Sequence, residues 1–146
     1  MKVVIGSDHA GYSLKEAIKK HLEEAGHEVL DKGTSDTSSC HYPIFAEAVA
    51  NAVVGGEAER GILVCGTGIG MSIAANKVKG IRAAALSDCF TAEATRKHND
   101  SNILCLGERT VGPGLAFKLV DIFLSTEFEG GRHQTRVDMM MAIENK

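Results

Sequence analysis

The amino-acid sequence predicts a single α/β domain in which helices cover both faces of a parallel sheet. The chain has 146 residues, which is about the length of one domain. Five short apolar runs alternate with segments whose apolar residues recur at helical spacing. Strands that alternate with helices in this way form parallel sheets. The sequence contains no internal repeat or linker, so we expect one doubly wound domain over residues 1–146.

Each predicted strand is a short apolar run that glycine or polar residues bring to an end. The first run, residues 3–5, is β-branched and is followed by the polar residues 7–9. The second run leads into a polar stretch, residues 33–41, which has the composition of a functional loop. In chain order, the expected strands are residues 3–5, 29–30, 62–65, 82–86 and 103–106.

Helices are expected between these strands and after the last one. Ser13 and Glu16 have the spacing of a capping box at the start of the first helix, and Gly26 ends that helix. Proline begins two later helices, at Pro43 and Pro113. In chain order, the expected helices are residues 14–25, 43–53, one through 73–75, one that Ser87 or Asp88 caps and that ends near 98–99, 113–123, and a C-terminal helix over 132–144.

Composition excludes several classes of protein. The chain has 16 basic and 19 acidic residues and a net charge of −3, whereas nucleic-acid-binding domains usually carry a basic excess. Hydrophobic residues make up 44% of the chain and charged residues 24%, which is typical of globular and not of disordered proteins. No apolar run approaches the ~20 residues of a membrane-spanning helix. The four cysteines form no CxxC pair, so we expect reduced thiols in a cytoplasmic protein that binds neither nucleic acid nor membranes.

Ligands of doubly wound sheets bind beyond the carboxyl ends of the strands. The glycine-rich segment 65–72 lies at such an end, where backbone N–H groups can bind an anion. It lacks the Gly-Lys-Ser/Thr of a Walker loop, and Met71 stands where the dinucleotide fingerprint has its third glycine. The alternative is a tight turn that needs glycines for backbone reasons alone. The segments at strand ends are residues 7–9, 65–70, 87–88 and 107–109.

Several side chains near the strand and helix ends could carry proton chemistry. Cys65 comes directly before the glycines, where a thiolate is stabilised, although an isolated cysteine there is often only a small buried apolar residue. Asp8 and His9 could accept hydroxyl groups and contact a phosphate, or could simply begin a turn. His98 ends a helix, where the dipole favours a protonated imidazole, and the alternative is a C-cap with Asn99 in the left-handed conformation.

Arg132 and Arg136 lie four residues apart on one helix face, where they could clamp a phosphate or could form an ordinary solvated surface. No cluster of His, Cys, Asp or Glu has the spacing of metal ligands, so we expect no metal and no other cofactor. An anion site, a candidate base, imidazoles and a basic pair suit proton transfer on a small phosphorylated substrate, such as the isomerisation of a sugar phosphate.

Seven motifs, in order along nearly the whole chain, resemble those of the type B ribose-5-phosphate isomerases. This family also includes allose-6-phosphate and galactose-6-phosphate isomerases. The resemblance therefore implies an aldose–ketose isomerase of ribose 5-phosphate and ribulose 5-phosphate that acts through a cis-enediolate. The motifs are Gly6 to Gly11 (GSDHAG), Tyr42-Pro43, Cys65 to Gly70 (CGTGIG), Ala74 to Lys77 (AANK), Gly80 to Ala83 (GIRA), His98 to Asp100 (HND) and Glu129 to His133 (EGGRH).

The resemblance implies a role for each matching residue. The implied catalytic residues are Cys65 as the base between C1 and C2, Thr67 at the substrate oxygen, and His98 with Asp8 for opening the furanose ring. The implied substrate contacts are His9, Tyr42, Gly66, Gly68, Ile69, Gly70 and Asn99, with backbone N–H groups of 66–70 binding the enediolate. The implied phosphate ligands are His9, Arg109, Arg132 and Arg136. One branch of the family uses a Glu at the position of Met71, so the resemblance leaves Cys65 as the base here.

The resemblance also implies an active site shared between two subunits, with His98 and the arginines donated by the neighbour. The C-terminal helix then serves dimerisation, in a homodimer or a pair of dimers. A 6-phosphorylated aldohexose such as allose 6-phosphate is the alternative substrate. Two alternative functions come from other classes of protein. A non-catalytic phosphosugar-binding module would have no use for a base at Cys65, and a thiol-redox protein would need a resolving cysteine.

Overall fold

The computed structural model describes all residues from Met1 to Lys146 and confirms the predicted α/β fold. Five strands form one sheet in the order β2-β1-β3-β5-β4, and every neighbouring pair is parallel. The carboxyl ends of β1, β3 and β5 therefore lie side by side in the middle of one edge. The strands are β1 (Lys2–Ser7), β2 (Glu28–Asp31), β3 (Arg60–Cys65), β4 (Ala83–Ala85) and β5 (Ile103–Gly107).

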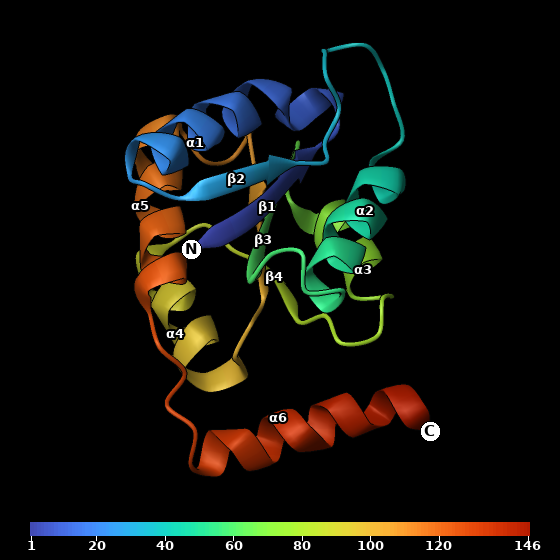
Figure 1. Ribbon diagram of the computed structural model, residues 1–146, viewed down its shortest axis with the longest axis vertical. Coiled ribbons are helices and arrows are strands. Elements are labelled where there is room, and N and C mark those ends of the chain that lie inside the picture. The colour runs from blue at the N-terminus through green and yellow to red at the C-terminus, as the bar shows by residue number, and fades with distance from the viewer.

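Helices cover both faces of the sheet, as Figure 1 shows. Alternate residues of β3 face opposite cores: Ile62 and Val64 pack with α1, α4 and α5, whereas Leu63 and Cys65 pack with α2 and α3. This burial on both faces explains why the strands are continuous apolar runs. The helices are α1 (Tyr12–Glu24), α2 (Tyr42–Val54), α3 (Ile69–Ala75), α4 (Cys89–Asn99), α5 (Pro113–Ser125) and α6 (Arg132–Ala142), with short 3-10 turns η1 (His9–Gly11) and η2 (Ile143–Asn145).

The last helix, α6, lies across one end of the molecule and packs against the end of α4 (Figure 1). The Glu144 carboxylate accepts two hydrogen bonds from the Gly80 N–H, at 3.0 and 3.2 Å, and so ties this end of the chain to the turn before β4. Met139 and Ile143 are more than half exposed on it. None of the helices combines the length and the apolar character needed to span a membrane.

The start of α1 differs from the prediction. The expected capping box of Ser13 and Glu16 is wrong, because α1 begins at Tyr12 and no side chain of its own caps it. Instead the Glu108 carboxylate, from the loop after β5, accepts a hydrogen bond of 2.6 Å from the Leu14 N–H. Glu108 therefore caps α1 from a distant part of the chain and fixes the β5–α5 loop against it. The predicted end of the helix is confirmed, since Gly26 has a φ of +91°.

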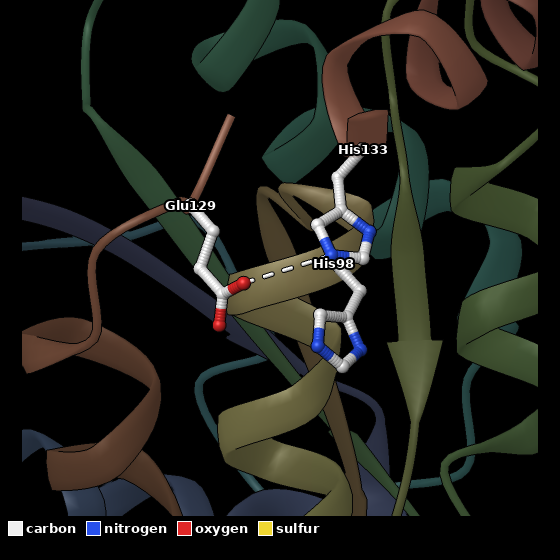
Figure 2. Close-up of side chains that lie close together, drawn as sticks. All are labelled: His98, Glu129 and His133. Atoms are coloured by element: carbon white, nitrogen blue, oxygen red, sulfur yellow. Dashed lines mark ion pairs between the residues drawn. The ribbon is translucent and has the colours of Figure 1, made fainter. Parts of the chain in front are cut away.

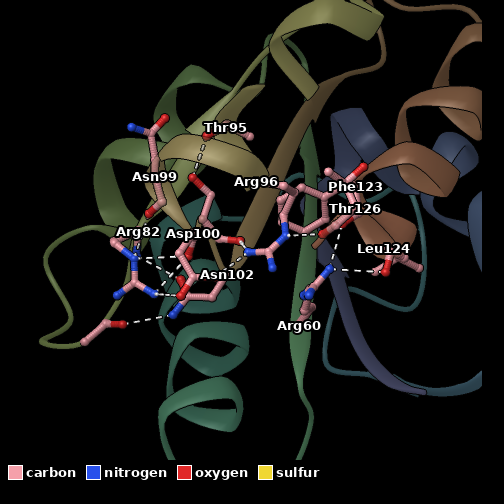
Figure 3. Close-up of polar contacts among 12 residues, drawn as sticks. Arg60, Arg82, Thr95, Arg96, Asn99, Asp100, Asn102, Phe123, Leu124 and Thr126 are labelled. Carbon is pink, nitrogen blue, oxygen red and sulfur yellow. Dashed lines mark hydrogen bonds and ion pairs between the residues drawn. The ribbon is translucent and has the colours of Figure 1, made fainter. Parts of the chain in front are cut away.

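The end of α4 is held by arginines (Figure 3). The Arg82 guanidinium donates to the carbonyl oxygens of Asn99 and Asp100 at 2.8 to 3.1 Å, and Arg96 pairs with the Asp100 carboxylate at 2.8 Å. Cations at the last carbonyls stabilise a helix C-terminus. The left-handed residue here is Asp100, with a φ of +48°, and not Asn99 as the C-cap alternative required. Asn99 keeps a free carboxamide, which points away from this network in Figure 3.

Candidate active site

Cys65 ends β3 and places its sulfur at the start of the glycine-rich loop. The side chain is 6% exposed, and its Sγ accepts a hydrogen bond of 3.1 Å from the Gly68 N–H. Gly68 has a φ of +79°, which turns the chain so that this N–H faces back to the sulfur. The thiolate is the form of cysteine that takes up a proton, and this N–H donor faces the sulfur at the mouth of the glycine-rich loop.

A second cysteine, Cys105, lies on the same face of the neighbouring strand β5. It is fully buried, and burial together with the nearby Cys65 raises the pKa of the Cys105 thiol. Cys105 therefore stays protonated, and Cys65 is the thiol of this pair that is available for chemistry.

The glycine-rich loop also offers free hydrogen-bond donors. The N–H groups of Gly66, Thr67, Gly70 and Met71 have no acceptor within the chain. The Thr67 side chain is exposed, and its Oγ1 accepts a weak bond of 3.3 Å from the Ile69 N–H. Four unpaired N–H groups beside a thiol can stabilise negative charge that develops on an oxygen.

Arg109, predicted to bind phosphate, and Tyr42, predicted to contact the sugar, both lie against this loop. A Cβ added to Gly66 would stand 3.1 Å from a terminal nitrogen of Arg109, and one added to Gly70 would stand 2.8 Å from the Tyr42 ring. The Arg109 N–H donates to the Gly66 carbonyl at 3.1 Å, so its backbone is fixed to the loop as well. Both glycines therefore allow a cation and a phenol to approach the loop closely.

Asp8 and His9 follow β1 at the same edge of the sheet. The Asp8 Oδ1 accepts from the N–H groups of Ala10 and Gly11 at 3.0 and 3.1 Å. Asp8 therefore begins a turn, which was the alternative to a role in binding. Its Oδ2 has no hydrogen-bond partner within the chain. The His9 Nδ1 accepts from the Cys40 N–H at 3.2 Å, so the ring proton of the neutral imidazole is assigned to Nε2 from this bond. His9 is thus oriented to donate a hydrogen bond through Nε2.

The other predicted residues lie at the opposite edge of the sheet. Helix α4 follows the carboxyl end of β4 and runs back to the amino end of β5, so it carries His98 and Asn99 away from Cys65 by its full length of about 16 Å. Arg132 and Arg136 are exposed on α6, which packs against this end of α4 (Figure 1). One chain therefore forms two separate groups of candidate residues. Cys65 lines none of the five main surface pockets of the chain. Asn99 lines the one with the greatest volume among these five, about 460 Å³.

At this second group His98 stacks on His133, a residue that the sequence did not single out (Figure 2). The ring centres are 4.4 Å apart and the planes differ by 17°. Burial and the charge of nearby His98 lower the pKa of His133, as do Arg132 and Arg136, against an opposing effect of Glu129. The lowered pKa favours the neutral form of His133 at pH 7. The two residues are 35 positions apart, so no local pattern indicated their contact.

The same residues include the one group that resembles a metal site. His98, Glu129 and His133 each offer a ligand atom, and these atoms lie within 4.8 Å of one another. The buried Nε2 of His133 has no hydrogen-bond partner and is 3.6 Å from the Glu129 carboxylate. Stacked rings direct their nitrogen lone pairs side by side and not toward a common point, so the present arrangement does not form a coordination sphere. The absence of a metal stays a prediction.

Comparisons with known proteins identify the family and the fold of the chain. Residues 3–140 match the family described as Ribose/Galactose Isomerase. The ribose-5-phosphate isomerase B of Escherichia coli is 51% identical, over 99% of this chain and 97% of its own. A ribose-5-phosphate isomerase B from Clostridium thermocellum superposes with a TM-score of 0.98 at 54% identity, over 99% of this chain and 98% of its own. A Mycoplasma genitalium ribose-5-phosphate isomerase B with bound ribulose-5-phosphate gives a TM-score of 0.94 at 42% identity, over 99% of this chain and 97% of its own.

Proposed function

The chain belongs to the ribose/galactose isomerase family and is a sugar-phosphate isomerase, and we propose that it interconverts ribose 5-phosphate and ribulose 5-phosphate. The observation that carries this proposal is the Cys65 sulfur beside four unpaired N–H groups, with Tyr42 and Arg109 against the same loop. Substrates named for the relatives, and ribulose-5-phosphate bound to one of them, support this choice.

Cys65 is the base in the proposed reaction. Its thiolate takes the proton from C2 of the open-chain aldose, and the electron pair moves to form a cis-enediolate. The proton on O2 passes to O1 within the cis-enediolate, and the same thiol returns a proton to C1 as the C2 carbonyl forms, which gives the ketose. The free N–H groups of the loop and the Thr67 hydroxyl stabilise the enediolate oxygens. Met71, which stands where other family members carry a Glu base, is fully buried and cannot take up a proton.

Ring opening and phosphate binding use the residues at both edges of the sheet. A furanose must open before C2 can lose its proton, and His98 is the proposed proton donor to the ring oxygen, with Asp8 assisting. The phosphate is bound by His9 and Arg109 together with the α6 arginines, Arg132 and Arg136, since guanidinium groups bind phosphate oxygens bidentately. Tyr42 and Asn99 contact the sugar.

The two groups come together when two copies of the chain assemble. Since His98 and Cys65 lie at opposite edges of one sheet, each proposed site takes Cys65 with Arg109 from one copy and His98 with Arg132 and Arg136 from the other. The exposed methionines of α6, Met139 and Met140, and the neighbouring Ile143 of η2 supply apolar surface for such a dimer. All four cysteines are free, which fits the reducing cytoplasm in which we expect the enzyme to work.

The test is the interconversion of ribose 5-phosphate and ribulose 5-phosphate by purified protein, with allose 6-phosphate as the parallel substrate. Turnover of the pentose phosphate supports the proposal. Turnover of the hexose phosphate alone keeps the mechanism but contradicts the substrate. Binding of both without turnover favours a non-catalytic phosphosugar-binding module.

A further inference from the structure

Lys15 is the one charged residue among the large fully buried side chains of the molecule, and it has no part in the proposed chemistry. It lies in the first turn of α1, and its side chain is 1% exposed. Burying an ammonium group is unfavourable unless its donors are satisfied. The partners of Lys15 therefore indicate why a lysine is present at this position.

The Lys15 ammonium joins the end of β2 to the loop that follows. Its Nζ donates to both oxygens of Asp31, at 3.2 and 3.0 Å, and to the Thr34 carbonyl at 2.7 Å. It also lies 3.3 Å from the Glu16 carboxylate and 4.9 Å from the centre of the Tyr12 ring. These contacts satisfy the charge and fix the first residues of the loop.

The same loop residues are fixed to β1, directly before Asp8. The Thr34 N–H donates to the Ser7 carbonyl at 3.0 Å, and Asp31 accepts from the Gly33 N–H at 2.9 Å. Gly33 lies so close to the Ser7 backbone that a Cβ would stand 2.5 Å from its nitrogen. The beginning of the loop is therefore held by Lys15 from one side and by β1 from the other.

The far end of the loop contacts the substrate site. Residues 35–39 are exposed, and the next residue, Cys40, donates its N–H to the Nδ1 of His9. Tyr42 follows two residues later and lies against Gly70. Loop 32–41 is thus fixed at its start by Lys15 and Asp31, and its end orients His9.

We propose that Lys15 is a positioning residue of the substrate site: its buried ammonium holds loop 32–41 in place, and the loop orients His9 and Tyr42. This inference rests on the proposed function, because it assigns His9 and Tyr42 to substrate binding. Lys15 itself does not touch the reacting atoms. Its loss therefore affects the fraction of molecules with an ordered loop, and the proton transfer at Cys65 proceeds as before once substrate is bound.

Lys15→Met tests the proposal, and Lys19→Met is the matched control. Lys19 pairs with the same Asp31 at 3.5 Å from the next turn of α1, but it does not contact Thr34. If Lys15→Met leaves about one loop in ten ordered, KM for the sugar phosphate rises about tenfold, whereas kcat stays within about twofold. Lys19→Met changes KM less than about twofold. Equal increases in KM for the two variants would overturn the proposal. The loss of one cation beside Asp31, which both variants share, would then explain them.

Hydrogen exchange without substrate gives a second readout. The amides of Thr34 and Cys40 exchange about tenfold faster in Lys15→Met than in the wild type or in Lys19→Met. Unchanged exchange over residues 32–41 would refute the role of Lys15. Faster exchange in a protein whose wild type isomerises no sugar phosphate would refute the proposed function and leave the loop contact intact. If Lys15→Met does not fold, Asp31→Asn, which keeps an acceptor for the Gly33 N–H, gives the same expected changes.

Discussion

Two inactive variants are expected to restore activity when they are mixed, because each proposed site joins residues from two copies of the chain. Cys65→Ala removes the base at the carboxyl edge of the sheet, and His98→Asn removes the ring-opening group about 16 Å away along α4. In the proposed two-fold dimer, every site pairs Cys65 of one copy with His98 of the other. A dimer of the two variants therefore has one site with both substitutions and one with neither.

The size of the effect follows from counting sites. Random exchange between equal amounts of the two variants makes about half of the dimers mixed, and one of the two sites in each mixed dimer is intact. About a quarter of the wild-type activity should return. The assay is ribose 5-phosphate isomerisation after the variants have been refolded together, with mixed dimers verified by native mass spectrometry.

A matched control separates shared sites from other effects of mixing. Cys65→Ala is refolded with the double variant that carries Cys65→Ala and His98→Asn in one chain, a pair that cannot form an intact site. That mixture should stay inactive. The reasoning is refuted if verified mixed dimers of the two single variants remain as inactive as the separate proteins.

Three further outcomes are expected. Glu108→Ala removes the cap from α1 and should lower the free energy of unfolding by about 1 kcal/mol in urea, whereas Glu108→Gln should lose less; equal stability of Glu108→Ala and wild type would contradict this. The pKa of His133 lies below its ordinary value of 6.5 in the folded chain, so the unfolded chain takes up the proton first. The stabilisation is therefore present above about pH 6.5 and is lost as the pH falls. Between pH 7 and pH 5 the free energy of unfolding in urea should fall less for His133→Gln than for the wild type. An equal fall in the two proteins would argue against the lowered pKa of His133. Incubation with EDTA should leave isomerase activity unchanged, and a loss that added zinc reverses would contradict the absence of a metal.

The sequence was sufficient for the fold because the three central strands, β1, β3 and β5, are buried on both faces. Ile62 to Cys65 reads as one apolar run since its alternate residues enter two different cores. The local signals at helix ends were less reliable. Ser13 and Glu16 have the spacing of a capping box, but the turn capped by Asp8 moves the start of α1 ahead of Ser13. Glu108, more than 90 residues away in the sequence, takes over the cap, and no local pattern contains that information.

Some residues of the candidate site can be placed from the sequence, and others can be placed only from the tertiary structure. Rules for parallel sheets place Asp8, His9, Cys65 and Arg109 at one edge from the sequence alone. The stacking of His98 on His133 and the contacts of Lys15 depend on tertiary packing, and periodicity describes only one element at a time. The separation of His98 from Cys65 follows from the direction of α4, which the order of strands and helices already determines.

The most direct test of the central claim compares wild type and Cys65→Ala in the interconversion of ribose 5-phosphate and ribulose 5-phosphate. Both proteins should fold and form the same dimer, since the Cys65 side chain is small and lies at the end of β3. We predict turnover by the wild type and loss of turnover, with substrate still bound, in Cys65→Ala. Undiminished turnover in Cys65→Ala would show that another group moves the proton and would contradict the mechanism.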